Sequence, residues 1–183
     1  AGGSIGAELC RQVAAFEAAH ITLLDFSETS LFEIDRELGE TCPGLSRKAA
    51  LVDVRNAARV AACFHREKPD LVFHAAALKH VSMVEHHPCE GVLTNVLGLQ
   101  PVAEAARAVG ADLIFVSTDK AVDPSGLMGA SKRLGEIYCQ ALDRQAAERA
   151  LPVRLGNVLG SAGSVTPIFE AQLAGGGPLT VTD

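Results

Sequence analysis

The chain has 183 residues, of which 16 are lysine or arginine and 22 are aspartate or glutamate, so its net charge is −6. This excess of acid argues against a nucleic-acid-binding protein, which normally carries a basic face, and a hydrophobic share of 48% excludes a disordered chain. No apolar run reaches the roughly 18 to 20 residues that cross a bilayer. No signal-peptide pattern opens the chain. The five cysteines have no C-x-x-C spacing, which is typical of a reduced cytoplasmic protein.

Short apolar segments alternate with helical patterns along the chain. Glycines in residues 2–6 lead into a first helix, whose apolar face is marked by Ile5, Leu9, Val13 and Phe16. Predicted strands then follow at intervals, and each is a continuous apolar run, as in strands that are buried on both faces. These strands are residues 21–25, 49–53, 70–74, 113–117 and 153–157.

Helical patterns fill the intervals between the strands. Pro101 lies inside the pattern of residues 89–109, where it predicts a kink or an interruption. The helix after the fourth strand has its apolar face at Leu134, Ile137, Tyr138 and Leu142. Residues 179–182 predict one more strand. This order predicts an α/β protein with a doubly wound parallel sheet, covered by helices on both faces, which binds ligands at the carboxyl ends of its strands.

The pattern is incomplete at both ends. A glycine loop of this kind follows a strand, yet none precedes residue 2, and no helical pattern follows residues 179–182. We therefore expect residues 1–183 to form one dinucleotide-binding domain that lacks its first strand and most of its C-terminal substrate-binding part, as a piece of a longer protein.

The first residues predict a phosphate-binding loop. Gly3 and Gly6 fit the second and third glycines of a G-x-x-G-x-x-G loop, at the start of a helix whose N–H groups attract a pyrophosphate. Asp25 ends the next strand 22 positions after Gly3, close to the ~20 expected of an acid that holds the adenosine ribose. A carboxylate there repels a 2′-phosphate and so favours NAD over NADP. Asp53, at the end of the following strand, lies either near the adenine or at the start of the next helix, before Asn56.

Polar residues gather at the end of the fourth predicted strand. Asp119 and Lys120 follow it closely, and an acid beside a lysine can divide the work of proton transfer. Met128 and Lys132 lie one helical turn apart in the next helix, where many short-chain dehydrogenases have Tyr-x-x-x-Lys. The one tyrosine, Tyr138, is not followed by lysine at that spacing. We therefore expect Lys132 to hold the nicotinamide ribose while proton transfer passes to Asp119 and Lys120.

Long motifs run through nearly the whole chain, in residues 2–6, 24–28, 53–55, 73–81, 94–96, 117–122, 128–133, 154–161, 163–165 and 176–182. In these motifs the chain resembles the CapD-like nucleotide-sugar 4,6-dehydratases of bacterial polysaccharide biosynthesis, a group of extended short-chain dehydrogenases with a Rossmann-type fold. Methionine at position 128, in place of tyrosine, resembles the long, membrane-anchored branch of that group.

The resemblance implies a reaction and a set of site residues. A bound NAD takes hydride from C4 of UDP-N-acetylglucosamine, Lys120 removes the C5 proton, Asp119 protonates the departing C6 hydroxyl, and hydride returns to C6, which yields a UDP-4-keto-6-deoxy sugar. The implied catalytic residues are Thr118, near the C4 oxygen, with Asp119, Lys120, Met128 and Lys132. The implied cofactor-binding residues are Gly2, Gly3, Ser4, Ile5, Gly6, Asp25, Ser27, Asp53, Val54, Ala75, Ala76, Ala77, Asn95 and Lys132. The implied substrate-binding residues are Lys79, Asn157, Ser164 and Val165.

Other interpretations stay open. A nucleotide-sugar 4-epimerase shares the fold and the first hydride step but needs no elimination at C6, and a C5-inverting dehydratase differs in stereochemistry. An NAD-binding regulatory domain would explain the missing tyrosine. His74, His80, His86 and His87 have no spacing typical of zinc, so we expect no metal. We expect a cytoplasmic homo-oligomer in which these residues contact neither nucleic acid nor membrane. For the full-length protein the resemblance implies an anchor at the cytoplasmic face of the inner membrane.

Overall fold

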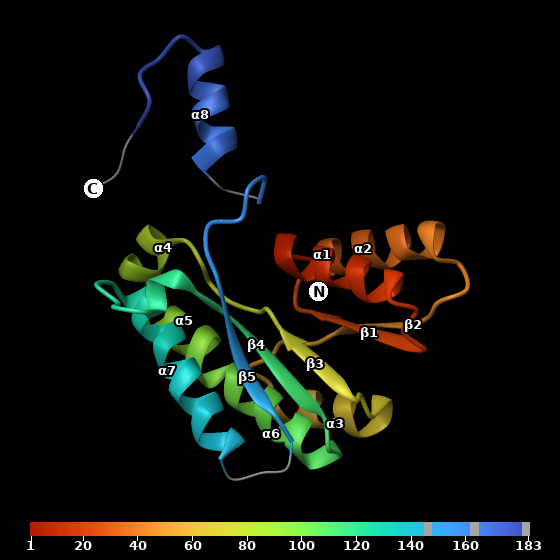
Figure 1. Cartoon of the computed structure of the whole chain (residues 1–183). Coiled ribbons are helices and arrows are strands. Elements are labelled where there is room, and N and C mark those ends of the chain that lie inside the picture. Colours follow the sequence, from red (N-terminus) through yellow and green to blue (C-terminus); the bar gives the residue numbers. More distant parts are fainter. Residues whose placement is uncertain (145–147, 162–164, 181–183) are drawn as a thin grey trace.

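The computed structural model describes residues 1–144, 148–161 and 165–180 and shows an α/β fold with parallel strands (Figure 1). Its first half contains α1 (Ser4–Ala15), β1 (His20–Asp25), α2 (Glu28–Thr41), β2 (Ser46–Leu51), α3 (Ala57–Glu67) and β3 (Leu71–His74). Its second half contains α4 (Val81–His86), α5 (Pro88–Val92), the π-helical turn η1 (Leu93–Leu97), α6 (Leu99–Val109), β4 (Asp112–Thr118), the 3₁₀ turn η2 (Asp119–Ala121), α7 (Leu127–Asp143), β5 (Ala150–Leu155) and α8 (Val165–Ala174). The α/β class predicted from the sequence is confirmed.

The strands form two parallel sheets instead of one. β1 pairs with β2, and β3, β4 and β5 pair in that order, all in parallel. In the part of the chain that the structure describes, no backbone ladder joins the two sheets. The break lies between β1 and β3, which is the place that the first strand takes in a doubly wound sheet.

The strands begin within three residues of their predicted positions. β2 and β5 each start three residues earlier than predicted, so Asp53 and Asn157 lie in the loops after these strands. The early start of β5 includes Pro152, which has no N–H to donate. Because β5 is the last strand of its sheet, the proline does not interrupt a ladder on both sides.

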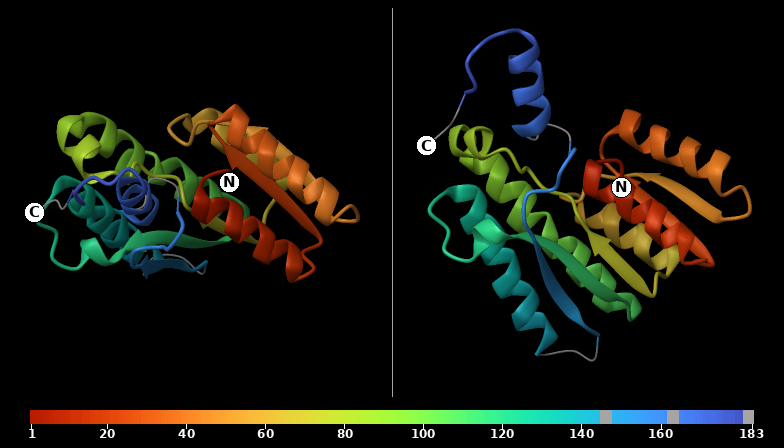
Figure 2. Two further views of the ribbon diagram at one scale, coloured as in Figure 1. Left: turned by 90° about the horizontal axis from the view of Figure 1, so that it is seen from above. Right: turned by 45° about the horizontal axis from the view of Figure 1, so that its top comes forward.

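Two apolar clusters hold the helices on the sheets. The larger joins α3, α6 and α7 to the second sheet, with Phe115 of β4 fully buried in it. The smaller joins α1 and α2 to β1 around Leu23 and Leu38. In Figure 2, α1 and α2 (red and orange) accordingly lie apart from α6 and α7 (green and cyan). The predicted apolar face of the first helix is wrong at Phe16, which is exposed, while Cys10 is buried instead.

One face of the second sheet remains partly open. The strand register places Leu71, Phe73 and Val153 on the same face, opposite to Phe115. Their exposed fractions are 48%, 38% and 43%, so the prediction that these strands are buried on both faces is wrong here. The apolar cluster that includes α6 and α7 forms on the side of Phe115.

The face that α7 turns inward matches its predicted apolar face only in part, because Tyr138 and Leu142 pack partly buried against the larger cluster whereas the other two predicted residues do not. Leu134 and Ile137 are about half exposed. The buried residues are Met128, Gly129, Ser131, Lys132, Gly135, Glu136 and Cys139. The helix lies so close to β4 that a Cβ at position 135 would come within 2.6 Å of the Phe115 ring. Small residues therefore line the contact with Phe115, and Leu134 and Ile137 point outward.

The helical segment from α5 to α6 is interrupted just ahead of Pro101. The π-helical turn η1 separates the two α-helices, and Pro101 is the third residue of α6. Proline cannot donate to the carbonyl of Leu97, four residues earlier, so an uninterrupted α-helical ladder cannot form there. The interruption that Pro101 predicted is thus present, one turn earlier than the proline itself.

α8 stands away from both sheets, at the top of Figure 1. Leu179 and Thr180, which follow it, belong to no strand, so the predicted strand 179–182 is wrong at these positions, and its other two residues lie outside the described part. None of the described helices has both the length and the apolar character needed to cross a bilayer.

Candidate functional site

Polar side chains from β4 and β5 meet where the two strands end. Lys120, in the turn after β4, donates from Nζ to Asp119 Oδ1 at 3.1 Å and to Asn157 Oδ1, after β5, at 3.0 Å. Thr118, the last residue of β4, donates from Oγ1 to Asp119 Oδ1 at 2.9 Å. The structure therefore brings four of the predicted residues into one hydrogen-bonded cluster, which we call the strand-end cluster.

The strand-end cluster is open to solvent and holds a charged pair. The side chains of Lys120 and Asp119 are 43% and 55% exposed. Hydrogen bonds from Lys120 and from Thr118 lower the pKa of the Asp119 carboxyl below its ordinary value. At neutral pH Asp119 is thus an anion that can accept a proton from a ligand bound at this edge.

Met128 and Lys132 lie beneath this edge rather than on it. Met128 is the second residue of α7 and is buried. Lys132 is only 6% exposed, donates from Nζ to the carbonyl of Val116 at 2.9 Å, and lies with its ammonium 4.6 Å from the centroid of the Phe115 ring. Burial lowers the pKa of Lys132 to about 8. The predicted cofactor lysine is therefore a buried, weakly basic amine on the inner side of α7.

We expect replacement of Lys132 by methionine to abolish a rise in stability between about pH 8 and pH 10. The pKa of Lys132 is about 8 in the folded chain against an ordinary value of 10.5. In this window the folded chain has released the proton and the unfolded chain still binds it, so the free energy of unfolding rises with pH, by about 3 kcal/mol at most. Urea unfolding at pH 7 to 10 measures the effect. Lys48→Met, at an exposed lysine, should keep the rise, and its persistence in Lys132→Met would contradict the prediction.

The glycine loop and Asp25 meet at the end of β1, as their spacing predicts. Asp25 Oδ2 accepts hydrogen bonds from the N–H of Gly2 at 2.7 Å and from the N-terminal ammonium of Ala1 at 2.8 Å, and Oδ1 accepts one from the N–H of Ser27 at 2.9 Å. Burial by itself raises the pKa of Asp25, but these hydrogen bonds outweigh it and lower the pKa overall. Asp25 is therefore a carboxylate that holds the loop against β1.

The start of α1 is open above Gly3. A Cβ at this position would have no heavy atom within 4 Å, whereas a Cβ at Gly6 would come within 2.5 Å of the carbonyl oxygen of Ala1. Gly3 is the N-cap of α1 and offers no side-chain cap, and the first turn, which holds Ser4, Ile5 and Gly6, has no acid. The positive end of the helix dipole is thus left available to an anion.

The other predicted cofactor residues divide into surface and buried positions. Ser27 caps α2 by accepting the N–H of Ser30. Asp53 binds Arg55 through both carboxylate oxygens, at 2.7 Å for the shortest contact, and its neighbour Val54 is buried in the larger cluster. Asp53 therefore faces an arginine instead of capping α3, a role that Asn56 fills.

Asn95 lies inside the protein, beneath the loop after β3. It is fully buried, accepts the N–H of Leu78 at 2.8 Å, and donates to the carbonyl of Leu78 and to Ser131 Oγ, each at 3.0 Å. These bonds tie to α7 the loop that contains the partly buried Ala75, Ala76 and Ala77. The structure thus places Asn95 as the support of a predicted cofactor loop.

The remaining predicted substrate residues are less well defined. Lys79 is exposed at the end of the same loop. Ser164 lies outside the described residues, and Val165 is the first residue of α8.

His74 is buried, and burial together with nearby Lys132 lowers its pKa to about 3. Among the described residues, no group of three or more His, Cys, Asp or Glu side chains is placed to hold a metal ion.

Glu136 is a polar residue that the sequence patterns missed. It is 1% exposed on the inner face of α7 and accepts hydrogen bonds from Ser117, Arg133 and Arg154. The available signal was its position, four residues after Lys132 and eight after Met128, which places it on the same helical face.

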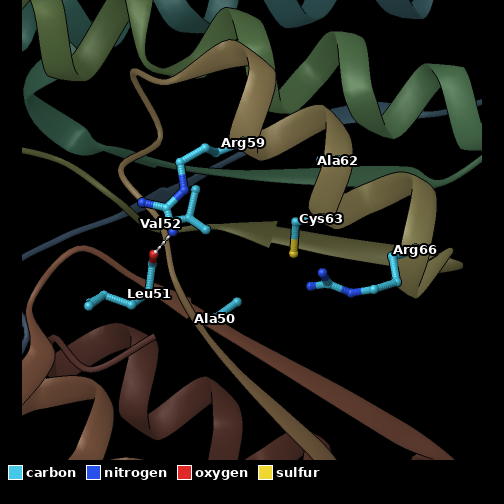
Figure 3. Close-up of a pocket in the computed structure, with 7 residues that line it drawn as sticks. All are labelled: Ala50, Leu51, Val52, Arg59, Ala62, Cys63 and Arg66. Atoms are coloured by element: carbon cyan, nitrogen blue, oxygen red, sulfur yellow. Dashed lines mark hydrogen bonds between the residues drawn. The ribbon is translucent and has the colours of Figure 1, made fainter.

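A cavity of about 200 Å³ lies elsewhere, between β2 and α3 (Figure 3). Arg59 crosses it and donates to the carbonyl of Leu51 at 2.8 Å. The cavity is lined by Ala50, Leu51, Val52, Arg59, Ala62, Cys63 and Arg66. None of the predicted site residues lines it, and it contains no acid that could pair with a base. The strand-end cluster and the glycine loop are therefore the better candidates for chemistry.

Comparisons with known proteins identify the family of the chain and agree with its fold. A family model described as polysaccharide biosynthesis protein matches residues 1–183. The capsular polysaccharide biosynthesis protein CapD of Staphylococcus aureus is 44% identical over 100% of this chain and 31% of its own length. A UDP-glucose 4-epimerase of Rickettsia canadensis is 41% identical over 86% of the chain and 46% of its own length.

A solved structure is similar over the whole chain. The X-ray structure of Pen from Bacillus thuringiensis is 34% identical, with a TM-score of 0.90, over 100% of this chain and 58% of that one. The likeness confirms the predicted fold. The chain spans less than two thirds of the length of each of these proteins.

Proposed function

The chain belongs to the polysaccharide biosynthesis protein family, and from this premise we propose that it is the NAD-binding part of a nucleotide-sugar 4,6-dehydratase. The proposed reaction converts UDP-N-acetylglucosamine to a UDP-4-keto-6-deoxy sugar with no net change in the cofactor. The observation that carries the proposal is the strand-end cluster, in which an acid, a lysine and a hydroxyl bind one another at the ligand-binding edge of the sheet.

NAD fits the residues around the glycine loop. The open space above Gly3 lets a pyrophosphate approach the backbone at the start of α1. The carboxylate of Asp25 faces the same loop and would repel a 2′-phosphate, which favours NAD over NADP. The proposed cofactor-binding residues are Gly2, Gly3, Ser4, Ile5, Gly6, Asp25, Ser27, Asp53, Val54, Ala75, Ala76 and Ala77, with Asn95 beneath the loop after β3 and Lys132 on the inner side of α7. When bound, NAD would accept a hydride from the sugar and return it.

The strand-end cluster supplies the proton transfers. Asp119 is an anion in the structure, so it can accept the C4 hydroxyl proton, next to Thr118, and later give that proton to the departing C6 hydroxyl as water leaves. Lys120 first gives an Nζ proton to solvent; the resulting amine takes the C5 proton and returns it to C5, and the ammonium is then restored from solvent. The proton lost from the C4 oxygen thus leaves in the water molecule, and both side chains end as they began.

A 4-epimerase is the second candidate, since a UDP-glucose 4-epimerase of Rickettsia is 41% identical to this chain. Epimerisation at C4 needs one proton acceptor and no acid for C6. The pairing of Asp119 with Lys120 supplies both an acid and a base, which favours the dehydratase. A dehydratase that also inverts C5 would use the same pair.

The test is to incubate the whole protein with UDP-N-acetylglucosamine and NAD and to analyse the sugar nucleotide by mass spectrometry. A product lighter by one water, with no accumulation of NADH, supports the dehydratase. An unchanged mass together with a chromatographically distinct sugar would support the epimerase. Recovery of untouched substrate would overturn both candidates for this sugar.

We expect Asp25→Asn to weaken NAD binding by about tenfold and to reduce the preference for NAD over NADP. Only one of the two polar atoms of an amide accepts hydrogen bonds, so the bond to either Gly2 or Ser27 is lost. The amide is also uncharged and no longer repels a phosphate. Titration of the protein with NADH and NADPH, followed by nucleotide fluorescence, measures both affinities. Glu28→Gln, three residues away, should leave them unchanged, and an unaltered affinity ratio in Asp25→Asn would contradict the proposed role.

A further inference from the structure

A buried carboxylate connects α7 to the two strands that end at the strand-end cluster. Glu136 accepts from Ser117 Oγ of β4 at 2.7 Å through Oε1. It also accepts from Arg154 of β5, at 2.8 Å from Nε to Oε1 and at 2.7 Å from Nη2 to Oε2. The carboxylate is only 1% exposed, whereas the Arg154 side chain that binds it is 41% exposed. Charge-assisted, two-bond contacts of this kind are stronger than neutral hydrogen bonds.

The two strand residues held by Glu136 are direct neighbours across the sheet. Ser117 and Arg154 are paired in the register of β4 and β5. One carboxylate therefore fixes the same level of both strands at once. This level lies directly before the carboxyl ends of the strands, since β4 ends at Thr118 and β5 at Leu155.

Each residue held by Glu136 lies three positions before one member of the strand-end cluster. Lys120 follows Ser117 by three residues and Asn157 follows Arg154 by three. Lys120 and Asn157 are themselves hydrogen-bonded, at 3.0 Å from Lys120 Nζ to Asn157 Oδ1. A shift of either strand end by about an ångström would break this contact. A displacement of that size in a catalytic group costs about 10²-fold in rate.

We propose that Glu136 is a positioning residue, which locks Ser117 to Arg154 so that Lys120 is held on Asn157 in the geometry that proton transfer needs. Glu136 does not itself touch the substrate. The inference rests on the proposed function and adds to it the device that aligns the acid and the base. It also assigns to Arg154 the task of transmitting this alignment to the loop after β5.

The test compares steady-state kinetics of the whole protein with UDP-N-acetylglucosamine for the wild type, Glu136→Gln, Asn157→Ala and the double variant. Glutamine keeps the shape of the side chain but presents an NH₂ group to Arg154, so one of the two guanidinium bonds is lost. We expect Glu136→Gln to lower kcat at least tenfold, with KM changed by less than threefold. In the double variant, Asn157→Ala should cost less than twofold further, because the contact is already broken.

Arg133→Gln is the matched control. Arg133 donates to the same carboxylate, from Nη1 to Oε2 at 2.9 Å, but it belongs to α7 and contacts neither strand through this bond. Its loss should leave kcat within twofold of the wild type. If Glu136→Gln fails to fold, Arg154→Lys replaces it, since lysine cannot make the two-bond contact, and the same fall in kcat and the same loss of coupling to Asn157→Ala are expected.

The outcomes are distinct. Additive effects of Glu136→Gln and Asn157→Ala, or an unchanged kcat in Glu136→Gln, would overturn the positioning role while leaving the proposed function intact. A fall in kcat that Arg133→Gln shares equally would show a general effect on α7 and would also overturn it. Absence of turnover by the wild-type protein would overturn the proposed function, and this inference with it.

Discussion

Replacement of Lys120 by methionine is expected to lower turnover of UDP-N-acetylglucosamine by between about 10² and 10⁴-fold, the range over which a positioned proton-transfer group contributes. Lys120 is the base that the proposal assigns to C5, and its Nζ lies within 3.1 Å of both Asp119 and Asn157. Methionine keeps much of the length and apolar character of the stem but cannot bind a proton. Mass spectrometry of the product over time gives the rate.

Asp119→Asn should lower turnover by a factor in the same range, because an amide can neither accept the C4 hydroxyl proton nor give a proton to the departing C6 hydroxyl. NADH binding should change by less than twofold in both variants, since no contact links the strand-end cluster to Asp25 or the glycine loop in the described residues. Asp123→Asn, at an exposed acid four residues on, should keep full turnover. Retention of more than a tenth of the rate in Lys120→Met would show that the base lies elsewhere.

Replacement of Glu136 by glutamine is expected to cost about 3 kcal/mol of stability at neutral pH, and the cost should vanish in acid. Hydrogen bonds from Arg154, Ser117 and Arg133 outweigh burial and lower the pKa of Glu136 to about 2, from an ordinary value of 4.5. A carboxyl with a lowered pKa stabilises the folded chain above pH 4.5, and this contribution disappears as the pH falls towards 2.

Urea unfolding of the wild type and Glu136→Gln between pH 6 and pH 3 measures this difference directly. The two free energies of unfolding should converge as the pH falls. Glu37→Gln removes an exposed carboxylate that binds Arg11 at 2.6 Å, and an exposed ion pair contributes about 1 kcal/mol or less. A loss of stability in Glu136→Gln no larger than that in Glu37→Gln would contradict the prediction.

The sequence predicted the order of strands well because continuous apolar runs and strand-end motifs are local signals. Asp25 and Lys120 could both be placed at strand ends from their distance to the preceding run. The orientation of α7 could not be predicted in this way. Two of its apolar residues, Leu134 and Ile137, point outward, since the inner face must fit the Phe115 ring and is built mostly of small and charged residues.

The burial of polar residues near the site could not be predicted from the sequence for a related reason. Glu136 and Asn95 are buried because each has several partners from distant segments, and no local pattern shows that such partners will meet. Asn95 was found only through the resemblance, as a cofactor residue, and the structure gives it bonds to Leu78 and Ser131. Contacts between residues far apart in sequence decide which polar side chains a helix can bury.

The π-helical turn at Leu93–Leu97 has a consequence for insertions and deletions. Successive residues of an α-helix are about 100° apart around the axis, and a π-helical turn accommodates one more residue than an α-helical turn. Deleting one residue from this turn would rotate the segment before it by about that angle relative to α6. Asn95 would then turn away from Ser131, and α7 would lose its link to the loop after β3. Chain length in this segment should therefore be much less free to vary than its sequence.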